Sequence, residues 1–142
     1  PVDYHRFHFP YAGTPGEPVC QPGKLYSVNP WALNKTLSYL WRNKRQKTVL
    51  ESRYGNRVTI VEIGATMVGR IHQTFTPGEF VGKGEEKGYF AIGGSCIVTL
   101  FAKGETVWDE DIMEYGMQGI EVYARMGDRC GLLLRPQGRK RG

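Results

Sequence analysis

The stretch GYFAIGGSCIVTLF at residues 88–101 contains two strand-like runs separated by Gly93, Gly94 and Ser95. Aromatic and β-branched residues fill both runs, and such residues fit a pleated, half-buried surface. Two glycines weaken a strand at this position, because they cost backbone entropy and add no side chain to pack. A β-bulge, a tight hairpin turn or a chemical role for Ser95 would each explain the interruption.

Segments of similar composition on both sides of this stretch predict a mainly β domain of the α+β type. Residues 48–52 and 57–63 alternate apolar and polar residues around the turn residues 54–56, which is typical of a hairpin. The Pro- and Gly-rich segment 10–30 favours turns and short edge strands. Further strands are expected at residues 24–28, 65–75, 87–92, 96–101, 121–125 and 130–134.

One or two short helices are expected among these strands. Asn29 and Pro30 form a helix start with Asn29 as the N-cap, and an apolar side continues from there to Trp41. The acidic residues at 109–114 suit the first turn of a second helix, where they face its positive end.

The composition and charge limit the class of protein. With 142 residues, 40% hydrophobic and 23% charged, the chain is the size of one globular domain. Its longest nearly apolar run, residues 96–102, is too short to span a bilayer. No apolar targeting segment and no initiator Met stand at its beginning, so we expect a fragment or a processed chain.

Two basic clusters, residues 42–47 and 139–141, contribute strongly to the net charge of +5. Such clusters attract the phosphates of nucleic acids or of an anionic membrane. No recognised nucleic-acid motif accompanies them, so we expect no nucleic-acid partner.

Neither the cysteines nor the histidines form a metal-binding pattern. Cys20, Cys96 and Cys130 lack the spacing of a zinc site, and three is an odd number for a disulfide framework. His5 and His8 are three residues apart in a segment of extended character, so they point to opposite faces and we expect no metal. Two histidines with separate chemical roles and a structural pair bonded to backbone both remain open.

The chemical interpretation of Ser95 is self-cleavage. A serine hydroxyl can attack the carbonyl of the preceding residue in an uncommon backbone geometry, and Gly94 has no Cβ to block that attack. A base must take the hydroxyl proton, and the chain offers only His5, His8 and His72 as histidine bases. We expect His72 to be structural, because it lies in a predicted strand.

Six blocks in order along the chain resemble the phosphatidylserine decarboxylases, which are self-cleaving, pyruvoyl-dependent enzymes. The blocks are DYHRFH (3–8), GKLYSVNPWAL (23–33), RNKR (42–45), VEIGATMVG (61–69), GEEKGYFAIGGS (84–95) and DED (109–111). They match the C-terminal part of a typical family member. The resemblance therefore implies an upstream segment outside this chain, which carries membrane-associating helices in bacterial relatives.

The resemblance implies that the whole chain, residues 1–142, is a catalytic domain that cleaves itself between Gly94 and Ser95. Ser95 would attack the Gly94 carbonyl, giving a β chain of residues 1–94 and an α chain of residues 95–142. Ser95 would become a covalent pyruvoyl group, whose carbonyl accepts the electrons left when an amino acid loses CO₂. No diffusible cofactor is implied.

By the same resemblance, His8 is the base for Ser95, and His5 acts in decarboxylation, near the substrate carboxylate or as a proton donor. Ser27 and Val28 correspond to the segment that lines the substrate pocket. The family's orienting Asp lies upstream of the DYHRFH block, so we expect this chain alone to cleave slowly or not at all.

The expected function is decarboxylation of phosphatidylserine to phosphatidylethanolamine at an anionic membrane surface. Peripheral association with lipid is favoured by the basic cluster 42–47 and by the apolar residues before it, Trp31, Leu33, Leu37 and Trp41. The partners implied are the lipid substrate, the membrane surface and the cleaved β and α chains for one another, and a homodimer is a family expectation.

Two other functions remain open. Related scaffolds act on free aromatic amino acids, so the substrate of a decarboxylase could be such an amino acid. The segment TFTPGEFVGKGEEKGYF at residues 74–90 also resembles biotinyl and lipoyl carrier domains. That likeness predicts a barrel-like β-sandwich and leaves open a non-catalytic, carrier-like binding module.

Overall fold

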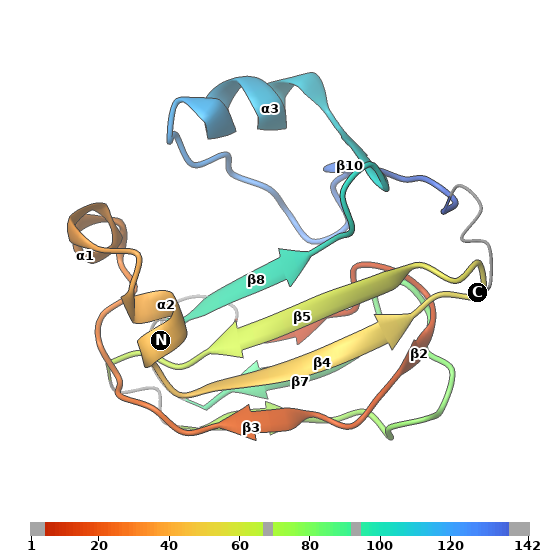
Figure 1. Ribbon diagram of the computed structural model, residues 1–142, viewed down its shortest axis with the longest axis horizontal. Helices are drawn as coiled ribbons and strands as arrows, with labels where there is room; N and C mark the ends of the chain where they lie inside the picture. Colours follow the sequence, from red (N-terminus) through yellow and green to blue (C-terminus); the bar gives the residue numbers. More distant parts are fainter. Residues whose placement is uncertain (1–4, 67–69, 92–94, 137–142) are drawn as a thin grey trace.

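The computed structural model describes residues 5–66, 70–91 and 95–136, which form three antiparallel sheets and three short helices (Figure 1). The largest sheet has the order β2 (Thr14–Pro15), β4 (Arg45–Glu51), β5 (Arg57–Ile63), β8 (Cys96–Leu100), and β3 (Val19–Gln21) also pairs with β4. A second sheet has the order β1 (Arg6–His8), β7 (Glu86–Phe90), β6 (Ile71–Gln73), and a third pairs β9 (Thr106–Trp108) with β10 (Gly131–Leu133). The helices are α1 (Pro30–Lys35), α2 (Tyr39–Arg42) and α3 (Glu110–Met117).

This architecture confirms the prediction of a mainly β, α+β domain. The predicted hairpin is β4–β5, in which Glu51 pairs with Arg57 across a turn closed by a 2.9 Å bond from Ser52 N to Asn56 O. Short edge strands in the Pro-rich segment are also present as β2 and β3. Within the described ranges the strands form open sheets and do not close into a barrel.

The predicted helix at Pro30 is divided into α1 and α2. Its start is confirmed, because Asn29 Oδ1 accepts a 2.8 Å hydrogen bond from Ala32 N. Thr36 adopts an extended backbone, and its Oγ1 accepts from Ser38 N at 3.1 Å. Side chains of Thr and Ser compete in this way with helical hydrogen bonding, so the helix stops before Thr36 and starts again after Ser38. None of the described helices is long and apolar enough to cross a membrane.

Several strand predictions are wrong. Residues 24–28 form only a single bridge, between Lys24 and Asn43, and residues 121–125 form no strand. In the segment 65–75, the described strand is limited to β6. The hairpin explanation for Gly93-Gly94-Ser95 is also wrong, because β7 pairs with β1 and β6 while β8 pairs with β5 in another sheet. Residues 92–94 themselves lie outside the described residues.

Two apolar clusters fill the interior. The larger one combines strands β4 and β5 with two loop segments and contains Phe9, Leu50, Val58, Ile60 and Val81. The smaller one lies within the three-stranded sheet and contains Phe7, Ile71 and Phe90. Figure 1 shows β4 and β5 running across β7, so the two larger sheets form facing layers.

A buried ion pair joins these two layers. Lys87 on β7 and Glu62 on β5 lie 2.8 Å apart, and both side chains are 0% exposed. Lys87 Nζ also donates to Thr48 Oγ1 at 3.0 Å and to Gln73 Oε1 at 2.7 Å. Gln73 Nε2 in turn donates to Glu62 Oε2 at 3.0 Å. Burial of such charges is tolerated only when they are paired and hydrogen-bonded, and here four strands supply the partners.

Burial shifts the titration of both members of this pair. Desolvation raises the pKa of Glu62 and lowers the pKa of Lys87, while each charge partly opposes the shift of the other. The two shifts have the same physical cause, because each charged form has left water.

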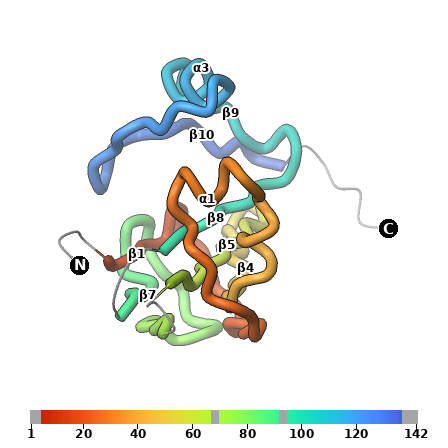
Figure 2. The backbone as a smooth tube through the Cα atoms, turned by 90° about the vertical axis from the view of Figure 1, so that its left-hand side faces the viewer, coloured from red at the N-terminus to blue at the C-terminus, as the bar shows by residue number. Residues whose placement is uncertain are grey.

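The C-terminal part of the described chain forms a separate layer. Figure 2 shows β9, β10 and α3 above the two larger sheets. No residue of α3 is buried, and many large apolar side chains of residues 107–134 are exposed. Contact with the main core is made by Phe101 and Leu133, and Asn56 Nδ2 donates to Leu134 O at 2.9 Å.

The ion pair generates the first prediction. Lys87→Met should lower the free energy of unfolding by about 3–5 kcal/mol at pH 8, because Glu62 is left as an uncompensated buried charge. In the folded variant, buried Glu62 would bind a proton at pH values where the unfolded chain has already lost it. The loss of unfolding free energy caused by Lys87→Met should therefore become smaller as the pH falls toward 5. Urea unfolding at both pH values measures this, with Lys87→Met/Glu62→Gln as the control that should recover most of the loss. An equal deficit at both pH values would contradict it.

Candidate functional site

Ser95 lies directly before β8, at the point where the chain enters the five-stranded sheet. The side chain is partly buried. The first pair of the β5–β8 ladder is Cys96 with Ile63, so Ser95 and Gly64 are each one residue beyond the same pair. β7 ends at Phe90 in the other sheet, and the connection that carries Ser95 therefore crosses from one layer to the other. Gly94 lies outside the described residues.

A pocket of about 420 Å³ opens between α1, α2 and the segment before α1. It is lined by Tyr26, Ser27, Asn29, Trp31, Ala32, Lys35 and Tyr39. The rings of Tyr26 and Tyr39 stack with centroids 4.7 Å apart, and Arg42 lies over Tyr26 at 5.5 Å. The predicted pocket residue Ser27 is thus in the wall of a pocket that combines aromatic surface with a lysine, while Val28 is partly buried next to it.

Asn43 links this pocket to the strand pair that holds Ser95. Its side chain bonds to both backbone groups of Tyr26 and, at 2.9 Å, to the carbonyl oxygen of Gly64. Gly64 follows Ile63, the ladder partner of Cys96. Figure 1 shows α1 and α2 at the end of the molecule where β8 begins, in agreement with these contacts.

His8 ends β1 and is held by a loop carbonyl. Its Nδ1 lies 2.9 Å from Gly84 O. A carbonyl oxygen only accepts, so Nδ1 carries the proton, and in the neutral imidazole the lone pair is on Nε2. The bond thus presents Nε2 as the basic atom. The register between β1 and β7 shifts at this point, with Phe7 opposite Gly88 and His8 opposite Glu86.

His5 lies at the other end of the β1–β7 pair. Its carbonyl oxygen accepts a 3.0 Å bond from Phe90 N, five residues before Ser95 along the chain. His5 is therefore next to the strand end from which the Ser95 connection departs, whereas His8 is next to the strand beginning. The roles of both histidines remain predictions. His72 lies in β6 as expected and stacks on Tyr89 with ring centroids 4.8 Å apart.

Cys96 is a potential competing nucleophile next to Ser95. Burial raises the pKa of the Cys96 thiol. The thiolate is the reactive form of cysteine, so this shift keeps the thiol protonated and unreactive near neutral pH.

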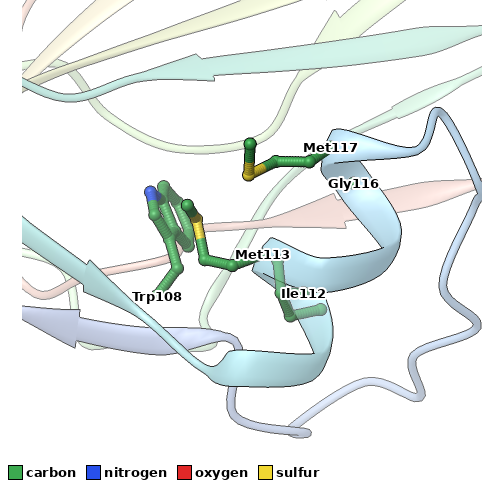
Figure 3. A pocket seen from close by; sticks show the side chains of 5 residues that line it. All are labelled: Trp108, Ile112, Met113, Gly116 and Met117. Atoms are coloured by element: carbon green, nitrogen blue, oxygen red, sulfur yellow. The ribbon is translucent and has the colours of Figure 1, made fainter.

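A second pocket, of about 270 Å³, lies against α3. It is lined by Trp108, Ile112, Met113, Gly116 and Met117, and Figure 3 shows Met113 beside the Trp108 ring with Met117 extending toward the same space. None of these five described residues is titratable, so they offer apolar surface but no acid, base or nucleophile. Across the described residues, no three side chains of His, Cys, Asp or Glu gather as metal ligands would.

Comparisons with known proteins identify the family of the chain. The family model of phosphatidylserine decarboxylase matches residues 1–132. The phosphatidylserine decarboxylase proenzyme of Chlamydia muridarum is 49% identical over 131 residues, which are 92% of this chain and 44% of the relative. The proenzyme of Clostridium novyi is 46% identical over 134 residues (94% and 45%), and that of Chlamydia pneumoniae is 41% identical over 131 residues (92% and 44%). The chain belongs to the phosphatidylserine decarboxylase family.

The chain spans less than half the length of these relatives. The family assignment predicted from the six sequence blocks is confirmed by the match.

Sequence reasoning missed Asn43, Lys35 and Tyr39. Asn43 was hidden in the basic cluster 42–47, where it was grouped with its charged neighbours. The available signal was an uncharged amide among the four cations of this cluster, because a residue that adds no charge to a basic cluster needs another explanation.

The Gly84 bond generates the second prediction. Neutral His8 should carry its proton on Nδ1, although free histidine prefers Nε2, because the Gly84 carbonyl accepts only from a protonated nitrogen. Long-range ¹H–¹⁵N correlation spectra of the ring nitrogens distinguish the two tautomers, and His72 serves as an internal reference. An Nε2–H tautomer for His8 would contradict the assignment of Nε2 as the base.

Proposed function

We propose that the complete protein decarboxylates phosphatidylserine to phosphatidylethanolamine after cleaving itself between Gly94 and Ser95. The observation that carries this proposal is the hydrogen-bonded path from the Tyr26–Ser27 pocket wall through Asn43 to Gly64, beside the strand pair that begins after Ser95. A reacting group at residue 95 and a substrate in the pocket would thus be held by one rigid assembly. The names of the relatives, all proenzymes, support self-processing.

In the proposed cleavage, the Ser95 hydroxyl attacks the Gly94 carbonyl, His8 takes the hydroxyl proton, and the Gly94–Ser95 C–N bond breaks as its nitrogen gains a proton, so that the amide becomes an ester. Elimination then releases the Gly94 carboxylate, and water converts the dehydroalanine left at residue 95 into the pyruvoyl group and ammonia. The Gly84 bond supports this role of His8, because it orients the ring and leaves the lone pair on Nε2. Attack within one chain avoids the entropy of bringing two molecules together, which can supply roughly 7–11 kcal/mol of a barrier. The protonated Cys96 thiol does not compete.

A pyruvoyl group at residue 95 fits the local structure. Cys96 is anchored to Ile63 by the ladder, so residue 95 would keep its position after the bond before it is cut. The group would supply a carbonyl that accepts the electrons released with CO₂. His5, next to the strand end at Phe90, would hold the substrate carboxylate or return a proton to the α-carbon.

The pocket supports a phospholipid head group as the substrate. Lys35 offers a cation for the phosphate or the carboxylate, and Ser27 offers a hydroxyl and backbone groups, with Val28 next to it. Trp31 is 82% exposed at the pocket rim, where an acyl chain would need apolar surface. A free amino acid has no acyl chain to place on this exposed apolar surface, and on that ground we favour the lipid as the substrate. The carrier-like alternative is disfavoured, because β7 and β8 do not form the hairpin that would present a modified tip.

The third prediction tests cleavage and the division of labour between the histidines. The full-length protein should yield two pieces that meet at Gly94–Ser95, and the C-terminal piece should carry a ketone instead of an amine. Ser95→Ala and His8→Ala should stay uncut, while His5→Ala should be cut but lose decarboxylation, since only the later step needs His5. Intact mass and carbonyl labelling measure the pieces, and CO₂ release from phosphatidylserine measures activity.

His72→Ala is the matched control and should be cut and active. A free Ser95 amino terminus would exclude the pyruvoyl mechanism. Equal loss of cleavage in His5→Ala and His8→Ala would exclude separate roles for the two histidines. Turnover of an aromatic amino acid in place of the lipid would refute the substrate assignment.

We also propose that the α1–α2 surface rests on an anionic membrane. Its apolar residues are exposed, with Trp31 at 82%, Leu37 at 58% and Trp41 at 60%. Lys35 and Arg42 stand in the last turns of the two helices, beside these side chains. Tryptophan prefers the membrane interface, and lysine and arginine attract anionic lipid. Homodimerisation remains a prediction from the resemblance.

The fourth prediction concerns this surface. Trp31→Ser/Trp41→Ser should weaken binding to phosphatidylserine-containing vesicles about tenfold, because each tryptophan would otherwise bury its ring in the interface. Co-sedimentation with the vesicles measures binding, and Trp108→Ser, which removes an exposed tryptophan from another layer, is the control. Equal loss in the control would show that this surface is not the membrane contact.

A further inference from the structure

We propose that Asn43 is a positioning residue that fixes the wall of the substrate pocket relative to Ser95. The proposal rests on the proposed function of that pocket and adds a residue with no assigned role. Asn43 is not one of the residues that line the pocket. It acts through its hydrogen bonds to Tyr26, Tyr39 and Gly64.

The side chain of Asn43 is completely buried and makes three hydrogen bonds. Its Oδ1 accepts from Tyr26 N at 3.0 Å, and its Nδ2 donates to Tyr26 O at 2.8 Å and to Gly64 O at 2.9 Å. Both backbone groups of Tyr26 are thereby satisfied by one amide. Among the described residues, the bridge at Lys24 is the one strand-like pairing of the segment 24–28, so the Asn43 amide takes the place of a neighbouring strand.

The backbone of Asn43 holds the opposite wall. Its N–H donates to Tyr39 O at 3.1 Å and ends α2, and its extended conformation turns the chain toward β4. Tyr39 and Tyr26 stack on one another in the pocket. One residue thus fixes two lining tyrosines, on the segment before α1 and on α2, and ties them to Gly64.

Only an amide of this length fits the three partners. Two of the partners are carbonyl oxygens that need a donor, and the third is an N–H that needs an acceptor. Aspartate cannot donate to the carbonyls, and alanine would remove the side-chain partner of all three backbone groups.

The fifth prediction uses the full-length, processed protein. Asn43→Ala should raise KM for phosphatidylserine about tenfold, because the variant loses the hydrogen bonds that order the pocket wall. It should leave kcat within about twofold, because residue 95, His5 and His8 are unchanged. Self-cleavage should remain complete. Asn56→Ala is the matched control: Asn56 is also buried and makes three side-chain bonds to Ser52, Glu105 and Leu134, but it lies at the other end of the β4–β5 hairpin. It should lose stability and keep KM.

A milder variant covers the case in which Asn43→Ala fails to fold. Thr66 Oγ1 donates to Leu25 O at 3.1 Å and is a second, exposed anchor of the same segment. Thr66→Val should leave folding unchanged and raise KM about threefold.

A ligand-independent measurement separates failure of this inference from failure of the proposed function. Amide hydrogen exchange of residues 24–28 should accelerate at least tenfold in Asn43→Ala and stay unchanged in Asn56→Ala. In an uncut Ser95→Ala background, calorimetric binding of glycerophosphoserine should weaken in parallel. Unchanged exchange, or a loss of kcat with KM unchanged, would overturn the positioning role. A parent protein that binds glycerophosphoserine but does not release CO₂ would refute the proposed function and leave the role of Asn43 in the pocket supported.

Discussion

The Lys87–Glu62 pair connects the two layers between which the candidate site is divided. His5 and His8 belong to the sheet of β1, β7 and β6, whereas Ser95 and the pocket depend on the sheet of β4, β5 and β8. The position of one sheet on the other therefore decides how the two histidines lie relative to Ser95. Apolar contacts between the sheets tolerate a small displacement of one sheet along the other. The 2.8 Å Lys87–Glu62 pair, with its bonds to Thr48 and Gln73, is satisfied in a single relative position of the two sheets. Such a pair is a weak source of net stability, and we infer that its main effect is this alignment.

Local features of the fold were predictable from the sequence, and the assignment of strands to sheets was not. The Asn29 cap and the β4–β5 turn depend on neighbouring residues, so composition and spacing identify them. The separation of β7 from β8 depends on their pairing with β1 and β5, which are more than thirty residues away along the chain. Nothing in GYFAIGGSCIVTLF distinguishes a hairpin from a crossing between layers.

The candidate site shows the same limit. Ser95 and the histidines stand out in the sequence because their residue types carry chemistry, and their roles are those that the resemblance implies. Asn43 and Lys87 look like ordinary polar residues in charged segments, and only their complete burial indicates what they do. Burial is a property of the tertiary structure, so residues that act by holding others are difficult to predict from a single sequence.

The crossing between layers also explains how a cut after Gly94 is compatible with a stable fold. No ladder joins β7 to β8, so a cut between them breaks no strand pair. The C-terminal piece would remain attached through the five residue pairs of β5 with β8, through Phe101 and Leu133 in the main core, and through Asn56 to Leu134. Under the proposed cleavage, the peptide bond is therefore lost between two strands that belong to different sheets, and the strand pairs that hold the core stay intact.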